Sequence, residues 1–134
     1  MQLTPPSLLI TDDDRDFRET LRAAFEPQGF RTLVAGDGVE ALEIVQREPV
    51  HLLLLDMHMP RLSGIETIRR VKQFREQLPC ILISADLDER LAEEARRVHA
   101  FSALAKPVRY ADVKRTIERA LQSVYGWLPT ERDS

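Results

Sequence analysis

Three adjacent aspartates follow a short apolar run near the start of the chain. In LLITDDDRD (8–16), Asp12, Asp13 and Asp14 come directly after four mostly apolar residues. Neighbouring carboxylates repel one another, so such a cluster is costly unless a cation compensates its charge. Asp56 ends a second apolar run, LLLLD. Carboxylate oxygens suit a hard cation such as Mg²⁺, so Asp12, Asp13 and Asp56 are predicted to hold a divalent cation.

A hydroxyl and an ammonium group end two further apolar runs. Ser84 ends the run CILIS, and Lys106 ends the run ALAK. An aspartate can act as a nucleophile toward phosphorus and accept a phosphoryl group. In that chemistry a metal ion and Lys106 would offset charge on the transferred group, while Ser84 would donate a hydrogen bond. These residue types therefore predict phosphoryl transfer to one of the carboxylates.

Five short apolar runs recur along the chain, and none alternates cleanly in polarity. Each is predicted to be a strand buried on both faces. Amphipathic helical stretches lie between them, which predicts an α/β fold: a doubly wound five-stranded parallel sheet with helices on both faces. Ligands bind beyond the carboxyl ends of such strands, where the aspartates, the serine and the lysine are expected to meet. The runs are LLIT (8–11), TLVA (32–35), LLLLD (52–56), CILIS (80–84) and ALAK (103–106).

Several helix starts carry capping signals. Asp14 and Asp16 are interpreted as capping acids, because anions suit a helix N-terminus. Two later helices begin with capping-box spacing, a capping side chain followed three residues on by glutamate. The pairs are Asp37 with Glu40 and Ser63 with Glu66.

Composition narrows the class of protein. With 134 residues, 43% of them hydrophobic, the chain is long enough for one domain with a core. A net charge of -3 offers no basic footprint for direct nucleic-acid binding. The single cysteine, Cys80, excludes a disulfide framework and favours a reducing compartment. MQLTPPS lacks signal-peptide character and no apolar run reaches membrane-spanning length, so a cytoplasmic domain without membrane contact is expected.

Four motifs resemble those of response-regulator receiver domains from two-component signalling: ITDDDRDFRETL, LLLLDMHMPRLSG, ILISA and ALAKP. They occur in the family's order and at its spacing over residues 7–121. The resemblance implies a flavodoxin-like sheet of strand order 2-1-3-4-5. It also implies a signalling switch rather than an enzyme. We expect a receiver domain at 1–121 and a tail or the start of a linker at 122–134.

The resemblance further implies the role of each acidic residue. Asp56 matches the residue that accepts a phosphoryl group from a sensor histidine kinase or a phosphotransfer protein in an Mg²⁺-dependent reaction. Asp13 would ligate magnesium directly, and Asp12 would help through water. Asp56 and the backbone carbonyl of His58 would complete the protein's share of the coordination.

The same resemblance covers the remaining site residues. Ser84 matches the family's switch hydroxyl, and Lys106 matches the residue that binds the phosphoryl group. The Lys106–Pro107 bond is implied to be cis, a geometry that proline alone makes inexpensive.

One feature departs from the family pattern. Receiver domains commonly carry Tyr or Phe three residues before the lysine, and this chain has Ala103. The departure calls into question how the structural effect of phosphorylation is transmitted from the site to the protein surface. By resemblance, the output face and a possible homodimer interface lie around the fourth helix, fifth strand and fifth helix. The first helix, with Arg15, Arg18 and Arg22, is interpreted as a kinase-docking edge.

Three other functions fit parts of the sequence. GDGVEA (36–41) matches a dinucleotide-binding fingerprint, but Asp37 and Glu40 would put negative charge where a pyrophosphate needs the helix N-terminus. An aspartyl-nucleophile phosphatase needs a second acid two residues after Asp56, where His58 stands. A receiver-like module that only binds partners would normally lack a site residue, and all five are present.

The remaining histidines and the cysteine suggest less. His58 and Asp86, each two residues beyond a site residue, are candidates to tune the lifetime of a phosphoryl group; a solvent-exposed pair is the alternative. His51 and His99 are interpreted as surface residues, and Cys80 as a small core residue.

Overall fold

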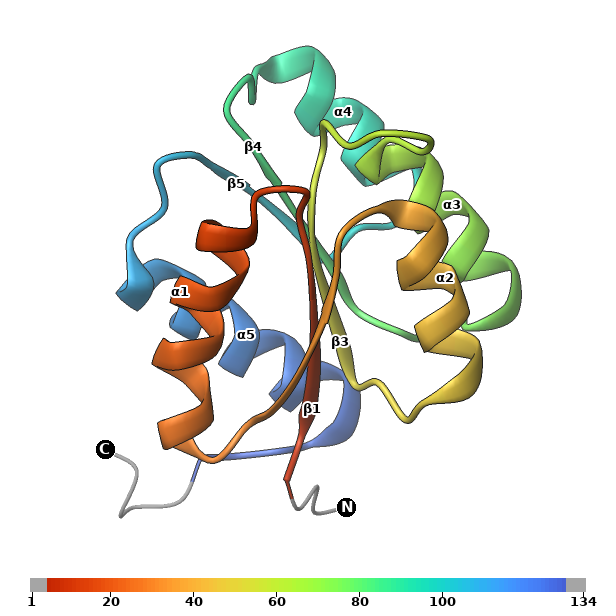
Figure 1. Cartoon of the computed structure of the whole chain (residues 1–134). Coiled ribbons are helices and arrows are strands. Elements are labelled where there is room, and N and C mark those ends of the chain that lie inside the picture. Colours follow the sequence, from red (N-terminus) through yellow and green to blue (C-terminus); the bar gives the residue numbers. More distant parts are fainter. Residues whose placement is uncertain (1–4, 130–134) are drawn as a thin grey trace.

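The computed structural model describes residues 5–129 (Figure 1), and in this range five parallel strands form one sheet in the order β2-β1-β3-β4-β5. The predicted doubly wound topology is confirmed, and each strand lies within one residue of its predicted run. The strands are β1 (Ser7–Thr11), β2 (Arg31–Ala35), β3 (Leu52–Asp56), β4 (Cys80–Ser84) and β5 (Ser102–Ala105). The helices are α1 (Arg15–Phe25), the 3-10 turn η1 (Glu26–Gln28), α2 (Gly38–Arg47), α3 (Gly64–Phe74), α4 (Glu89–Arg97) and α5 (Tyr110–Tyr125).

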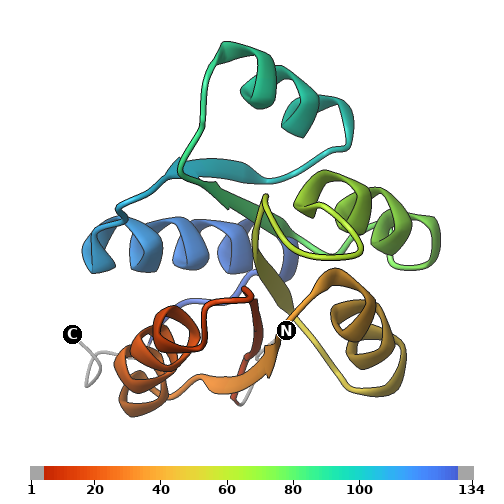
Figure 2. The same ribbon diagram turned by 45° about the horizontal axis from the view of Figure 1, so that its top comes forward.

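Helices cover both faces of the sheet (Figure 2): α1 and α5 lie on one face, and α2, α3 and α4 on the other. Successive strand residues face opposite layers, because strand side chains alternate. Leu8 and Ile10 pack with α1 and α5, whereas Leu9 packs with the other three helices. The strands β1, β3 and β4 are buried at every position. Each fully buried leucine contributes about 1.5–3 kcal/mol, so the central strands are firmly held.

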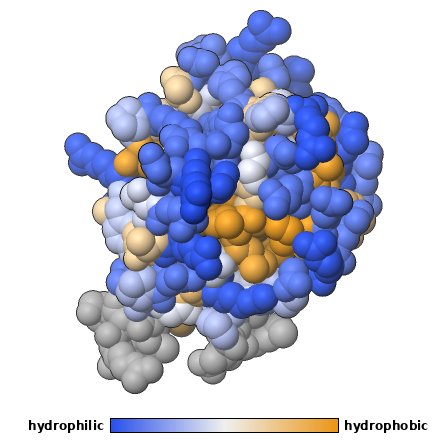
Figure 3. All heavy atoms as spheres, viewed as in Figure 1, coloured by the Kyte–Doolittle hydropathy of each residue, from blue (hydrophilic) through white to orange (hydrophobic). Residues whose placement is uncertain are grey.

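The two edge strands differ from prediction. β2 and β5 are only partly buried, so burial on both faces is wrong for them, because an edge strand has a neighbouring strand on one side only. Figure 3 shows a hydrophobic patch between β2 and α2 on an otherwise largely hydrophilic face. Leu33 on β2 and Leu42 on α2 are accordingly only partly buried.

The predicted caps of α2 and α3 are confirmed. Asp37 Oδ1 accepts a hydrogen bond from the backbone N–H of Glu40 at 2.8 Å, and Ser63 Oγ accepts one from Glu66 at 3.1 Å. The Glu40 carboxylate in turn accepts from the backbone N–H of Gly36 at 2.7 Å. These bonds satisfy amides that a helix start leaves without partners, and they fix where each helix leaves the sheet edge.

The end of the described chain packs against the domain. Helix α5 continues to Tyr125, and Gly126 ends it in the left-handed conformation (φ 69°). The ring of Trp127 then lies 5.6 Å from that of Phe30. Helix α5 therefore runs four residues past the predicted boundary at Leu121, and aromatic contacts hold its last turn. Residues 130–134 lie outside the described part, and the domain boundary at Leu121 stays a prediction.

His51 joins this C-terminal packing. Its Nδ1 accepts the backbone N–H of Ser7 at 2.9 Å, and its carbonyl accepts the Tyr125 hydroxyl at 2.8 Å. Burial, with a contribution from the charge of Arg75, lowers the pKa of His51. The surface interpretation is therefore wrong for His51, which is half-buried, and right for His99, which is exposed.

Across 5–129, none of the helices has the length and apolar character needed to cross a membrane.

Candidate functional site

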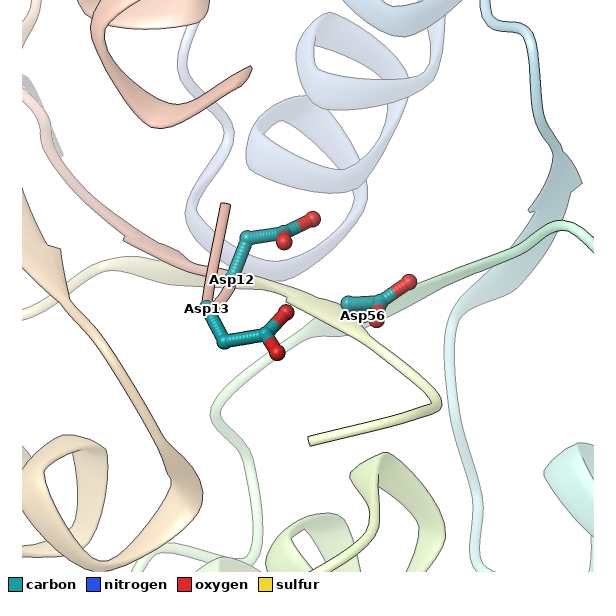
Figure 4. Close-up of side chains that lie close together, drawn as sticks. All are labelled: Asp12, Asp13 and Asp56. Atoms are coloured by element: carbon teal, nitrogen blue, oxygen red, sulfur yellow. The ribbon is translucent and has the colours of Figure 1, made fainter. Parts of the chain in front are cut away.

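Three carboxylates converge at the carboxyl edge of the sheet (Figure 4). Asp12 and Asp13 follow β1, and Asp56 ends β3, the strand beside β1. One oxygen from each lies within 4.8 Å of the others. Two ligands on opposite sides of Mg²⁺ are about 4.2 Å apart, so small side-chain adjustments let these oxygens share one ion. The three predicted metal ligands therefore fit a hard cation.

The carboxylates differ in burial. Asp12 is 1% exposed and Asp56 is 6% exposed, whereas Asp13 is exposed. Burial raises the pKa of Asp12; hydrogen bonds from the Asp14 amide at 2.9 Å and from Lys106 oppose that effect, and the charge of Asp56 adds to it. Asp12 is thus a buried acid beside a second buried carboxylate, an arrangement whose negative charge a further cation would offset.

Lys106 supplies positive charge to this edge. Its Nζ lies 2.9 Å from Asp12 Oδ2 and 3.1 Å from Asp56 Oδ1. Burial alone would lower the pKa of the ammonium group, but hydrogen bonds and charges from the two aspartates outweigh it, so the pKa of Lys106 is raised. Lys106 is therefore a cation directed into the site, as predicted, and it follows β5 immediately.

Ser84 lies at the same edge. It ends β4, whose residues Ile83 and Ser84 pair with Asp56 and Ala105. Its side chain is buried, and its Oγ accepts the backbone N–H of Asp86 at 3.1 Å. Its carbonyl accepts the backbone N–H of Lys106 at 2.9 Å. The topology thus puts the hydroxyl at the predicted edge, beside the strand that carries Asp56.

The Lys106–Pro107 peptide bond is cis, as the resemblance implied.

His58 and Asp86 meet across the loops that follow β3 and β4. The Nε2 atom of His58 lies 3.0 Å from Oδ2 of Asp86, and both side chains are exposed. The backbone N–H of His58 bonds Asp56 Oδ2 at 3.2 Å. The role of the His58 carbonyl as a metal ligand stays a prediction. So does the role of the His58–Asp86 pair in setting the lifetime of a phosphoryl group.

Two contacts hold the loop after Asp56 in place. The N–H of Gly64 bonds the carbonyl of Met57 at 2.8 Å, closing the loop onto β3. Arg61, in the left-handed region at φ 72°, pairs with Asp37 at 2.6 Å. The backbone amide of Glu40 and the Arg61 guanidinium hold the pKa of Asp37 below its ordinary value. From the sequence, Asp37 could be identified only as a helix cap. Its distance from Arg61 along the chain gives no sign that the two side chains form an ion pair.

The surroundings of Gly38, in the GDGVEA motif, disfavour dinucleotide binding. A Cβ at Gly38 would collide with the hydroxyl of Thr67 and with Leu62. The glycine therefore serves close packing of α2 on α3. This packing, together with the negative charge of Asp37 at the start of α2, makes the helix N-terminus unsuitable as a pyrophosphate-binding site.

Comparison with known proteins agrees with the geometry. The sequence matches the response regulator receiver domain family over residues 8–118. It is 32% identical over 114 residues to sporulation initiation phosphotransferase F of Bacillus subtilis, covering 85% of this chain and 92% of that protein. It is 31% identical to response regulator RR06 of Streptococcus pneumoniae, covering 89% of this chain but 54% of that protein. The chain thus spans about half of that longer relative.

Solved structures show the same fold. A CheY-like receiver domain protein from Methanospirillum hungatei superposes with a TM-score of 0.87 at 21% identity, covering 90% of this chain and 97% of that one; at this identity the likeness concerns the fold alone. A receiver domain from Clostridium thermocellum superposes with a TM-score of 0.82 at 26% identity, covering 88% and 95%. Receiver domains generally bind Mg²⁺ and interact with histidine kinases or phosphotransfer proteins. The chain belongs to the family of response regulator receiver domains, the signalling switches of two-component systems.

Proposed function

We propose that Asp56 is the phosphoacceptor of this receiver domain and takes a phosphoryl group from a histidine of a sensor kinase or phosphotransfer protein. The observation that carries the proposal is the contact of the nearly buried Asp56 carboxylate with Lys106, at 3.1 Å, beside two further carboxylates. An acid is rarely buried without such partners. The free thiol of Cys80 fits a reducing compartment, so we place this activity in the cytoplasm.

The reaction needs little from the protein beyond position and charge. An oxygen of Asp56 forms a bond to phosphorus while the bond to the donor histidine nitrogen breaks, and the imidazole keeps that electron pair. Lys106 offsets negative charge on the transferred group, and the Ser84 hydroxyl donates a hydrogen bond to it once it is attached. Mg²⁺, when bound, would offset charge on the carboxylates and the phosphoryl oxygens.

The cation would be held by a defined set of ligands. Asp13 and Asp56 would bind it directly, with Asp12, the most buried of the three acids, acting through water. The backbone carbonyl of His58 would add one ligand. Mg²⁺ usually keeps several waters and uses only one or two carboxylates, so three acids are sufficient.

A groove of about 600 Å³ beside the site supports a kinase-docking role for α1. Its walls include Phe17 and Leu21 of α1, together with Val108 and Tyr110 after β5. This mostly apolar surface would receive a helix of the donor protein. The three arginines contribute unequally, because Arg18 is half-buried and bonds the carbonyl of Asp12 at 2.7 Å.

Intact-mass measurement with acetyl phosphate and Mg²⁺ tests the acceptor. Wild-type protein should gain one phosphoryl group, and Asp56→Asn should gain none, because an amide oxygen is a poor nucleophile and the variant keeps the shape of the side chain. An equal adduct on both proteins would show that the acceptor is another residue.

The output surface is proposed around α4, β5 and α5, where a homodimer would form. A hollow of about 270 Å³ there includes Leu87, Phe101 and Ala103 in its wall, so an aromatic ring borders it although the position three residues before Lys106 is alanine. The partly exposed β5 edge supports an interface at this place. Light scattering before and after phosphorylation should show the mass doubling, and a mass that stays monomeric would contradict the dimer.

A further inference from the structure

The ammonium group of Lys106 has a third neighbour besides its two carboxylates. Its Nζ lies over the face of the Phe17 ring, 4.4 Å from the centroid. Asp12 and Asp56 occupy the other directions at 2.9 and 3.1 Å. A cation over an aromatic face is attracted by the negative potential of the ring. The phosphoryl-transfer roles assigned above do not involve Phe17, so this contact calls for its own explanation.

The acidic run fixes the position of Phe17. Asp14 is the N-cap of α1, and its Oδ1 accepts from the backbone N–H groups of Asp16 at 3.0 Å and of Phe17 at 3.4 Å. Asp12 Oδ1 accepts in turn from the N–H of Asp14 at 2.9 Å. The first turn of α1 is thereby tied to the end of β1. Phe17 lies in that turn, which puts its ring above the residue that follows β5.

We propose that Phe17 is a positioning residue whose ring holds the Lys106 ammonium group at the phosphoacceptor edge. The Lys106 side chain is only 24% exposed, and the ring is part of what covers it. An aromatic face makes no directional hydrogen bond. The ammonium group can therefore exchange a carboxylate oxygen for a phosphoryl oxygen and keep its contact with the ring. This inference rests on the proposed function, in which Lys106 binds the phosphoryl group.

A purely structural role for Phe17 predicts different behaviour. Any apolar side chain of similar size would then fill the space above Lys106 equally well. Attraction to the ring depends on its electron-rich face, so tyrosine and tryptophan should replace phenylalanine and leucine should not. Fluorination separates the two cases further, because it withdraws electron density from the face with little change in shape.

The first test measures the rate of phosphorylation by acetyl phosphate at saturating Mg²⁺. This small donor avoids any effect of Phe17 on kinase docking. Phe17→Leu should slow the reaction about three- to tenfold, equivalent to about 0.7–1.4 kcal/mol of barrier. Phe17→Tyr should stay close to wild type, and increasing fluorination of Phe17 should slow the reaction stepwise. Equal rates for Phe17→Leu and Phe17→Tyr would overturn the proposal.

A double-mutant cycle then asks whether Phe17 acts through Lys106. In a Lys106→Met background, Phe17→Leu should cause no further loss of rate. An equal loss in both backgrounds would mean that Phe17 acts elsewhere, and the proposal would be wrong. Glu19→Gln, on the exposed part of α1 and outside the groove that contains Phe17, is the matched control and should react like wild type. Thermal unfolding of each variant checks that it is folded.

A second readout needs neither magnesium nor phosphorylation. In NMR spectra, the ε-methylene protons of Lys106 should be shifted upfield by the ring current of Phe17, and Phe17→Leu should abolish that shift. If the chemical shift of these methylene protons in wild type were that of an ordinary lysine, the ring would not lie over the ammonium group and the proposal would be wrong. If wild type accepts no phosphoryl group, the proposed function fails by itself, while the NMR result still decides whether the ring holds Lys106.

Discussion

Asp12 and Asp13 are neighbours in sequence but have different tasks. Asp12 is buried, and its carboxylate is occupied by the Asp14 amide and the Lys106 ammonium group. Asp13 is exposed and turns toward Asp56 (Figure 4). The first therefore orients the lysine and the helix start, and the second is the accessible acid of the proposed cation site. Asp14, the third acid of the run, caps α1, as predicted.

His51 gives the domain a pH dependence far from this site. Burial, and then the charge of Arg75, lowers the pKa of His51, and protonation of Nδ1 would remove the acceptor for the Ser7 amide. The unfolded chain has a histidine pKa of about 6.5. The stability contributed by neutral His51 is thus fully present above about pH 6.5 and is lost as the pH falls through the lower folded-state pKa.

The expected result is a fall in the free energy of unfolding as the pH drops below about 6.5, and this fall should be smaller in His51→Asn. Asparagine can accept the same hydrogen bond but does not titrate. Urea unfolding at a series of pH values measures both proteins. Parallel curves for wild type and the variant would show that His51 is not the group responsible.

At the scale of elements, the start of α3 presses against the end of β3. A Cβ at Gly64 would lie 2.6 Å from the carbonyl oxygen of Asp56, a backbone atom that cannot move without moving the acceptor. Gly64→Ala should lower the free energy of unfolding by about 1–3 kcal/mol and slow phosphorylation. Denaturant unfolding and the acetyl phosphate reaction measure the two effects.

Gly36→Ala is the matched control for that substitution. The nearest atoms to a Cβ there are the ends of the Arg18 and Glu40 side chains, at 3.4 and 3.6 Å, and side-chain ends can shift. Its effect on stability and rate should be small. Similar losses in both variants would mean that the close approach at Gly64 is not what matters.

The features that depend on topology could be predicted from the sequence alone. Parallel strands bring their carboxyl ends to one edge, so the residues that end β1, β3, β4 and β5 could be placed together from the order of the apolar runs. Contacts between loops could not be predicted, because they depend on local backbone geometry. The Arg61–Asp37 pair needs φ 72° at Arg61, and the Lys106–Phe17 contact needs the particular turn that Asp14 sets.

The same limit applies at the C-terminus. Residues 122–134 were predicted to be a tail or the start of a linker, yet the Tyr125 hydroxyl and the Trp127 ring both contact residues far away in sequence. Burial of the edge strands was overestimated for a related reason. An apolar run shows that a strand is apolar, but its place in the sheet decides how much of it is covered.

For the whole molecule, the proposed cation binding at the carboxylate cluster predicts a coupling between the cation and stability. Asp12 and Asp56 share the ammonium group of Lys106 at close range, and an oxygen of Asp13 lies within 4.8 Å of theirs. In the unfolded chain the three acids are not held together and are fully hydrated. A cation that binds only the folded state stabilises it by RT ln(1 + [L]/Kd), about 2.7 kcal/mol at a concentration one hundred times Kd. Mg²⁺ should therefore raise the thermal midpoint of wild type, and removing it with EDTA should reverse the change.

Asp13→Ala should lose most of this stabilisation, because it removes the accessible ligand. Asp16→Ala is its matched control: Asp16 is an exposed acid in the first turn of α1, outside the three-carboxylate cluster, and its variant should respond to Mg²⁺ like wild type. Calorimetry gives the two affinities directly, and thermal scans at matched ionic strength exclude general screening. Without Mg²⁺, Asp13→Ala should be at least as stable as wild type, because one repelling charge is gone. If Mg²⁺ stabilised Asp13→Ala as strongly as wild type, the ion would have to bind elsewhere, and the cluster would be only a group of capping and lysine-orienting acids.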